Sequence, residues 1–190
     1  ITIFKDASCN FDASLAVTGD VTDEADNCDT SLDAPYADVV TPGTCEGEEI
    51  ITRTWTLTDD CGNTTQHVQV ITAIDNIAPA FTVPADITIF KDAGCNYNAA
   101  VGVTGDVTDE ADNCDTSLDA TYADVVTPGT CEGEEIITRT WTLTDDCGNT
   151  TQHVQVITAK DNTAPTFTVP ADITIFKDAS CNFDASLAVT

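Results

Sequence analysis

The stretch Ile136–Ala159, IITRTWTLTDDCGNTTQHVQVITA, decides the fold class of this chain. Threonine fills every second position from Thr138 to Thr144, and larger residues such as Trp141 stand between them. Alternation with a period of two residues, rich in β-branched side chains, is typical of a β-strand with one buried face. A second alternating run, Thr151–Ala159, follows the turn sequence Asp-Asp-Cys-Gly-Asn. The stretch therefore predicts a β-hairpin.

The hairpin occurs twice because the sequence repeats itself. Residues 1–86 align with residues 87–172 without gaps, and only ten aligned positions differ. Residues 1–18 recur unchanged as residues 173–190. Near-identical copies at a fixed period of 86 residues are typical of tandem modules. We therefore expect a piece of a longer array, divided into a module without its first strand (1–76), a complete module (77–162) and the start of a third (163–190).

Shorter alternating runs predict the rest of each module. Residues 81–90 are expected to form a first strand that Pro84 interrupts, and further short strands are expected at Ala99–Thr104 and Ala120–Val126. A long acidic loop, Asp106–Asp119, lies between those two strands, and no helix of useful length is predicted. Many short strands with frequent turns predict an all-β fold, with tandem immunoglobulin-like antiparallel β-sandwich modules stacked end to end.

The net charge of the chain limits the classes of molecule that it can bind. There are 33 acidic and 6 basic residues, which gives a net charge of −27. Such a field repels nucleic acid and anionic membranes and attracts divalent cations. Hydrophobic residues make up 42% of the chain, which argues against disorder. We expect no nucleic-acid partner and, because no apolar run is long enough, no membrane span in this sequence.

Each module carries four cysteines, an even number that is typical of disulfides in an oxidising compartment. A zinc site is disfavoured because no CxxC pair occurs. If consecutive strands run in alternating directions, alternate loops share one end of the module. Cys95 then shares an end with Cys131, and Cys114 shares the other end with Cys147. This parity predicts disulfides within modules, at Cys9–Cys45, Cys28–Cys61, Cys95–Cys131 and Cys114–Cys147.

The same parity places the exit of a module at the end opposite its entrance, so that successive modules form a rod. The joins, Ala73–Pro79 and Ala159–Pro165, are short and contain proline, and a stiff connection is therefore expected. Three acidic segments meet at such a join, and Ca²⁺ prefers carboxylate and amide oxygens. The alternative is a solvated acidic rim whose side chains only form turns. The candidate calcium ligands are Asp75, Asn76, Asp109, Glu110, Asp112, Asn113, Asp145 and Asp146.

No pattern in the sequence indicates catalysis. It contains no Ser/His/Asp arrangement, no nucleophile motif and no phosphate-binding loop. His67 and His153 fit exposed strand positions. Trp55 and Trp141 fit the core better than a sugar-binding platform, because each shares a strand face with a leucine. The chain is therefore not expected to be an enzyme.

Three motifs give the chain a family resemblance. They are Asp-Asn-Thr-Ala-Pro at 161–165, Val-Pro-Ala-Asp-Ile at 169–173 and Thr-Leu-Thr-Asp-Asp-Cys-Gly-Asn-Thr-Thr at 142–151. Together they resemble the hyalin repeat, and most closely the cysteine-containing HYR-like modules of giant surface proteins in gliding Bacteroidetes, such as the SprB-type gliding adhesins. The resemblance covers the whole chain. It implies an immunoglobulin-like fold, secretion and a cell-surface role in adhesion, and it brings no catalytic residues.

These observations favour a structural stalk segment of a secreted or surface-anchored adhesin, located outside the cell or on its surface. Its partners would be neighbouring repeats of the same chain. One alternative is a binding module, in which each repeat contacts a surface glycan or protein ligand and avidity comes from number. Another is a subunit of a fibre that assembles with other copies laterally or end to end.

Overall fold

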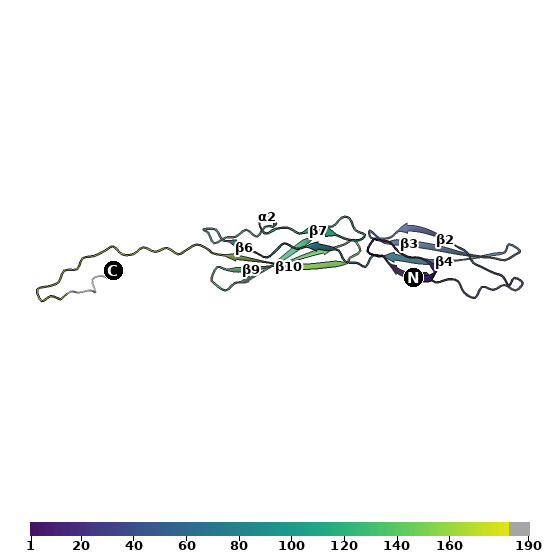
Figure 1. Ribbon diagram of the computed structural model, residues 1–190, viewed down its shortest axis with the longest axis horizontal. Coiled ribbons are helices and arrows are strands. Elements are labelled where there is room, and N and C mark those ends of the chain that lie inside the picture. The colour runs from purple at the N-terminus through teal and green to yellow at the C-terminus, as the bar shows by residue number, and fades with distance from the viewer. Residues whose placement is uncertain (183–190) are drawn as a thin grey trace.

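The computed structural model describes residues 1–182, and residues 183–190 of the expected third module lie outside this range. Two β-rich modules lie in line along one axis, and the C-terminal segment extends away from the second (Figure 1). The N-terminus lies beside the first module, and the C-terminal segment starts at the far end of the second (Figure 1). No helix in the described range is both long enough and apolar enough to cross a membrane.

The second module holds two sheets. β6, β10, β9 and β8 form a four-stranded sheet in that order, while β5 and β7 form a separate two-stranded sheet. The predicted hairpin is confirmed, because β9 and β10 pair antiparallel with Trp141 opposite His153. The strands are β5 (Ala80–Thr82), β6 (Ile87–Phe90), β7 (Thr108–Ala111), β8 (Thr121–Pro128), β9 (Glu135–Thr144) and β10 (Thr150–Lys160).

The first module has a four-stranded sheet with the same arrangement. Its strand order is β1-β4-β3-β2, which corresponds strand for strand to β6-β10-β9-β8. A helical turn of four residues follows β1 in the first module and β6 in the second. The elements are β1 (Thr2–Phe4), α1 (Leu15–Thr18), β2 (Tyr36–Pro42), β3 (Glu49–Thr58) and β4 (Thr64–Ile74), with α2 (Val101–Thr104) as the turn of the second module.

Two sequence-based expectations about the strands are wrong. Ala99–Thr104, predicted as a strand, contains the helical turn α2, which Gly105 ends at a φ of 94°. The turn is favoured because it presents the Thr104 carbonyl to the buried amide of Gln155, at 2.7 Å. The predicted acidic loop Asp106–Asp119 contains β7, which pairs with β5.

The sheets are also not purely antiparallel. β6 runs parallel to β10, and β1 runs parallel to β4. Pro84, which lacks an N–H donor, separates β5 from β6 and lets the chain pass from the small sheet to the edge of the large one. The strand directions nevertheless keep the predicted parity. β9 runs from the Cys131 turn to the Cys147 turn, and β8 runs in the opposite direction.

The two sheets of the second module pack face to face through an apolar core. Phe81 of β5 contacts Trp141 and Leu143 of β9, and these side chains are 8%, 1% and 0% exposed. A second cluster around Ile137 and Ile157 lies toward the other end of the sheet. Trp141 is therefore a core residue, as the sequence predicted.

A buried arginine ties the helical turn to the sheet. Arg139 is 1% exposed, and its Nε and Nη2 both donate to Asp124 at 2.8 Å. Nη1 donates to the Thr104 hydroxyl at 2.8 Å, and Nη2 also donates to the Ala99 carbonyl at 2.7 Å. The guanidinium lies 4.1 Å from the centre of the Tyr122 ring. Each of the three guanidinium nitrogens thus donates to at least one acceptor, and such pairing offsets the cost of burying a charge.

Replacing Arg139 with methionine should destabilise the second module by about 1–3 kcal/mol, because the Ala99 carbonyl and the Asp124 carboxylate, whose side chain is 28% exposed, lose their donors. Urea denaturation followed by tryptophan fluorescence measures the change. The double variant Arg139→Met with Asp124→Leu should recover part of the loss, since it removes both charges. A loss below about 1 kcal/mol in the single variant would contradict this assignment.

Candidate functional site

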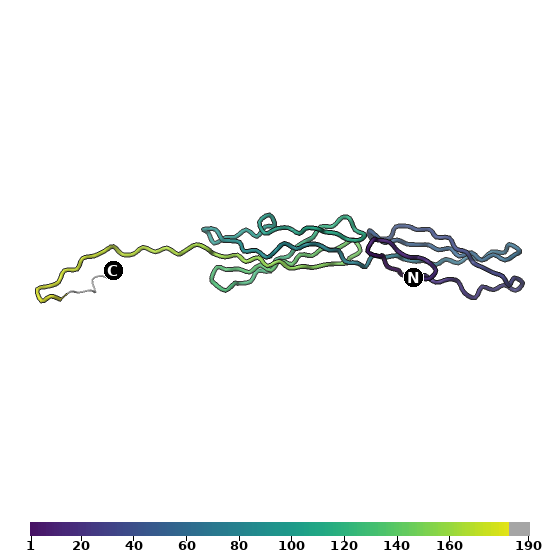
Figure 2. The backbone as a smooth tube through the Cα atoms, viewed as in Figure 1, coloured from purple at the N-terminus to yellow at the C-terminus, as the bar shows by residue number. Residues whose placement is uncertain are grey.

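The join between the two modules holds both disulfides and a group of three carboxylates. Loops from the end of the first module meet loops from the beginning of the second at this point (Figure 2). Cys9 and Cys45 lie on the first module's loops, and Cys114 and Cys147 lie on the second module's loops. Parity placed the members of each pair at the same end of their module, and the strand directions agree with this.

The disulfides cross the join. Cys9 bonds to Cys114 and Cys45 bonds to Cys147, with Cα–Cα distances of 5.1 and 5.2 Å and sequence separations of 105 and 102. In the chain-entropy model, a bridge that closes a loop of this length stabilises the folded state by roughly 4–5 kcal/mol. Two disulfides also indicate an oxidising environment of the extracellular type.

All four predicted pairings are therefore wrong. The parity of the strands correctly placed two cysteines at each end of a module. The prediction treated each module alone, however, and the end of one module faces the beginning of the next. The bonded partners are the cysteines that face each other across the join. Within the described residues, the cysteines left as exposed free thiols are Cys28, Cys61, Cys95, Cys131 and Cys181.

Tight turns orient the joined cysteines. Cys9 has a φ of 59°, in the left-handed region, and the Asp6 carboxylate holds its turn by accepting the N–H groups of Ser8 and Asn10 at 2.8 and 2.9 Å. The N–H of Asn10, and then that of Ser8, keep the pKa of Asp6 below its ordinary value. The lowered pKa means that this turn keeps its support at neutral pH and loses it only in acid. Across the join, the Cys114 N–H donates to Asp112 at 2.8 Å.

Gly47 allows the first disulfide to approach the backbone. Its φ is +89°, and a Cβ at this position would lie 2.6 Å from Cys114 Cβ and 2.8 Å from Cys114 Sγ. Any side chain here would collide with the bridge. Only glycine combines this backbone angle with the absence of a Cβ.

Hydrogen bonds add to the covalent contacts. The Asn113 amide donates to the Asp6 carbonyl at 3.2 Å, and the Thr116 hydroxyl donates to Glu46 at 3.1 Å. The peptide link itself is packed, since Pro79 is fully buried and Asp75 is only 5% exposed. The connection between the modules is therefore closed on several sides.

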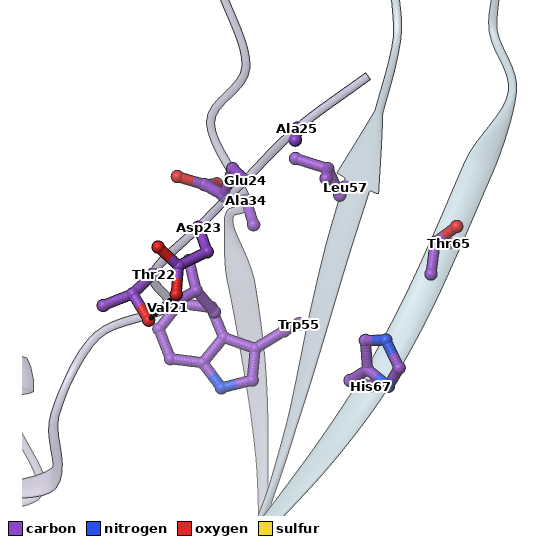
Figure 3. Close-up of a pocket in the computed structure, with 10 residues that line it drawn as sticks. All are labelled: Val21, Thr22, Asp23, Glu24, Ala25, Ala34, Trp55, Leu57, Thr65 and His67. Carbon is purple, nitrogen blue, oxygen red and sulfur yellow. Dashed lines mark hydrogen bonds between the residues drawn. The ribbon is translucent and has the colours of Figure 1, made fainter. Parts of the chain in front are cut away.

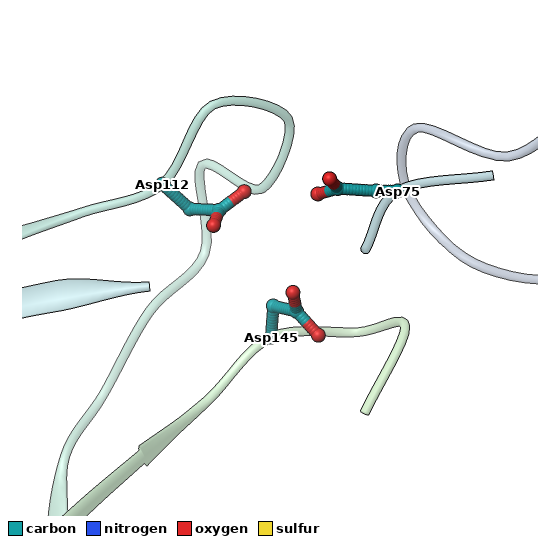
Figure 4. Close-up of side chains that lie close together, drawn as sticks. All are labelled: Asp75, Asp112 and Asp145. Carbon is teal, nitrogen blue, oxygen red and sulfur yellow. The ribbon is translucent and has the colours of Figure 1, made fainter. Parts of the chain in front are cut away.

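Three carboxylates converge at the centre of the join. Asp75 comes from the link, Asp112 from the loop after β7 and Asp145 from the turn after β9, and one oxygen of each lies within 4.8 Å of the others. Figure 4 shows the three side chains pointing toward one another. Asp75 and Asp145 are each 5% exposed. Within residues 1–182, none of the three forms an ion pair.

The arrangement fits the chemistry of a hard divalent cation. Three carboxylates at such short distances repel one another strongly when they are buried, and a cation relieves that repulsion. Oδ1 of Asp112 and Oδ1 of Asn113 are buried without a hydrogen-bond partner, so both are available as ligands. The amide of Asn113 donates to Asp75 at 3.0 Å, which places this side chain beside the carboxylates.

The other predicted calcium ligands lie outside this group. Glu110 accepts the N–H of Ala120 at 2.7 Å, and Asp109 accepts the hydroxyl of its neighbour Thr108 at 3.1 Å. Asn76 and Asp146 have exposed side chains. Asp75, Asp112 and Asp145, with Asn113 beside them, are thus the subset of the eight predicted residues that the structure brings together.

No family model matches the chain, and no curated protein matches it either.

Substituting Gly47 with alanine should hinder the Cys9–Cys114 bond, because the new methyl group collides with Cys114. We expect two additional reactive thiols per chain in the folded, oxidised protein, measured by thiol titration and mass spectrometry. Gly19→Ala is the matched control. Gly19 also has a positive φ, of +84°, but a Cβ there meets nothing within 4 Å. An unchanged thiol count in Gly47→Ala would contradict the packing at the join.

Proposed function

We propose that this chain is a non-catalytic stalk segment of a secreted or surface-anchored adhesin. The observation that supports this best is the pair of disulfides across the join. A single peptide link between two bodies leaves them free to swivel. Two further bonds at separate points on the same cross-section remove those rotations. Force and bending are then carried by covalent bonds from one module to the next.

We further assign the modules to the immunoglobulin-like class, of the HYR-like type found in giant gliding adhesins. A four-stranded sheet packed on a smaller sheet through Phe81 and Trp141 supports this assignment. The motifs at the join and in the Asp145–Asn149 turn support it as well. An extracellular setting also fits the two disulfides.

Calcium would add to the stiffness of the join. We propose that Asp75, Asp112 and Asp145 hold one Ca²⁺ ion, with Asn113 as a fourth ligand. Because these residues come from the link and from two loops of the second module, the ion would fix the link against the module that follows it. Solvent or backbone oxygens would complete the six to eight ligands that Ca²⁺ takes.

Calorimetry should detect one calcium ion per chain, and Asp112→Ala should weaken binding at least tenfold because it removes a carboxylate with an unpartnered oxygen. Asp26→Ala is the matched control. Asp26 is the counterpart of Asp112 in the first module, and within residues 1–182 it belongs to no group of converging carboxylates. Equal calcium affinity in the two variants, or no heat of binding at millimolar calcium, would contradict the calcium site. The carboxylates would then only form a solvated acidic rim.

Small-angle scattering on proteins of two, four and six modules tests the stalk itself. The longest dimension should grow linearly, by about 35–45 Å per module, given strands of about ten residues. Replacing the join cysteines with serine should reduce that growth, because the link alone permits bending. Growth with the square root of module number in the native, oxidised protein would rule out a stiff stalk.

A further inference from the structure

The four-stranded sheet of each module has two sides of opposite character. In the second module the inner side packs on the small sheet and holds the ion pair between Arg139 and Asp124. We call the other side the outer face. Because side chains alternate along a strand, it consists of the even-numbered residues of β6, β9 and β10 and the odd-numbered residues of β8. In the first module the outer face consists of the residues 86 positions earlier.

The contacts within a module lie on the inner side. In the first module, Trp55, Leu57 and His67 lie on that side and border a cavity of about 310 Å³ (Figure 3). Arg53 belongs to the same side and donates to the Thr18 hydroxyl of α1 at 2.6 Å. The threonines that alternate with these residues along β3 belong to the outer face.

The outer face exposes apolar side chains in both modules. In the second module, Val125 and Val154 are 61% and 52% exposed, and Phe90 is 58% exposed. In the first module, Val39 and Val68 are both 62% exposed. A single exposed valine is ordinary, but an apolar surface that recurs on the same side of two modules indicates a contact site.

The outer face also lacks the negative charge of the chain. The chain has 33 acidic residues, and in the two described modules none of them belongs to this face. Its one charged residue is Lys160 at the end of β10, which pairs with Glu134 at 3.1 Å. Contact through the acidic loops would bring carboxylates of two copies together, whereas contact between two outer faces does not. The face is therefore suited to a second copy of this chain.

The polar groups of the outer face can leave water at little cost. Gln152 Nε2 donates to the Thr142 hydroxyl at 2.9 Å, and the hydroxyl oxygens of Thr144 and Thr150 are 3.0 Å apart. The first module repeats both contacts, at 3.0 and 3.3 Å. Burying a polar group is costly when the group loses its hydrogen bond, and these groups keep theirs within the sheet.

The size of the outer face suits a weak contact that repetition strengthens. Four strands about 4.8 Å apart, with about five outward residues spaced by about 6.8 Å, give roughly 500 Å² per module. A pair of such faces buries about 1,000 Å² in total, which is near the lower limit for a specific interface. Pairing of both modules doubles the buried area and adds avidity.

We propose that the outer face packs on the outer face of a second copy of this chain, so that two copies lie side by side. The contact is one of sheet on sheet, with the valine and threonine rows of the two faces interdigitating about 10 Å apart. A twofold axis between the copies lets one surface serve both partners. A stiff stalk needs no lateral contact, so the two proposals stand or fall separately.

Sedimentation of the oxidised chain, with its exposed thiols alkylated, tests this contact. We expect association that depends on protein concentration. The double variant Val68→Glu with Val154→Glu should weaken it about 100-fold, because each glutamate would place an unpaired carboxylate inside the contact. Added salt should strengthen the association of the unchanged sequence, because it screens the repulsion between copies and the contact contains no attracting charges.

The matched control is the double variant Ser31→Glu with Thr82→Glu. It adds the same two carboxylates, one in each module, at exposed positions outside the outer face. Association should stay almost unchanged in this control. A chain that remains monomeric at millimolar concentration, or equal weakening in the two double variants, would overturn the proposal.

A conservative double variant, Val68→Thr with Val154→Thr, keeps the test decisive if the glutamates disturb the fold. Threonine retains the branched shape and strand preference of valine but replaces a methyl group with a hydroxyl. The melting temperature should match that of the unchanged sequence, while association weakens about tenfold. Unchanged association in this variant, or association of the unchanged sequence that weakens as salt rises, would contradict the lateral contact.

Discussion

The two disulfides that cross the join are the constraint on which the rest of the molecule depends. Together with the peptide link, they connect the modules at three separate points. The positions of the Gly47 turn and of the three converging carboxylates follow from this closure, since both depend on loops of the second module meeting the first. Small β-modules bury limited apolar surface and commonly rely on such covalent staples. Here the staples stabilise the array rather than the single module.

Contacts inside each module hold the loops at its two ends in fixed positions. Arg139 joins β8, β9 and the α2 turn through hydrogen bonds, and the Phe81–Trp141 contact fixes the small sheet on the large one. The long β9–β10 hairpin carries the cysteine turns at opposite ends. Each module therefore presents one kind of cysteine pair at its entrance and another at its exit, and the two kinds are complementary.

The sequence was sufficient for the hairpin and for the placement of loops at the two ends, because period-two alternation and strand parity are local rules. It was not sufficient for Val101–Thr104, a short apolar run that fits a strand or a turn equally well until Arg139 and Gln155 select the turn. It missed β7 because Thr108–Ala111 is polar and becomes a strand only beside β5. It mispaired the cysteines because identical repeats give the same residues within a module and across a join. The sequence could not exclude Glu110 from the candidate metal ligands, because only the fold shows that its carboxylate accepts the N–H of Ala120.

The pairing of the cysteines is the claim on which this account rests, and peptide mapping without reduction tests it most directly. Free thiols are first alkylated on the monomeric chain, and trypsin then cuts after each of the six basic residues, Lys5, Arg53, Lys91, Arg139, Lys160 and Lys177. The account predicts that fragment 6–53 stays bonded to both 92–139 and 140–160, while 54–91 is released with an alkylated Cys61. Fragment 6–53 bonded instead to 54–91, with 92–139 bonded to 140–160, would place the disulfides inside the modules and contradict the stapled stalk.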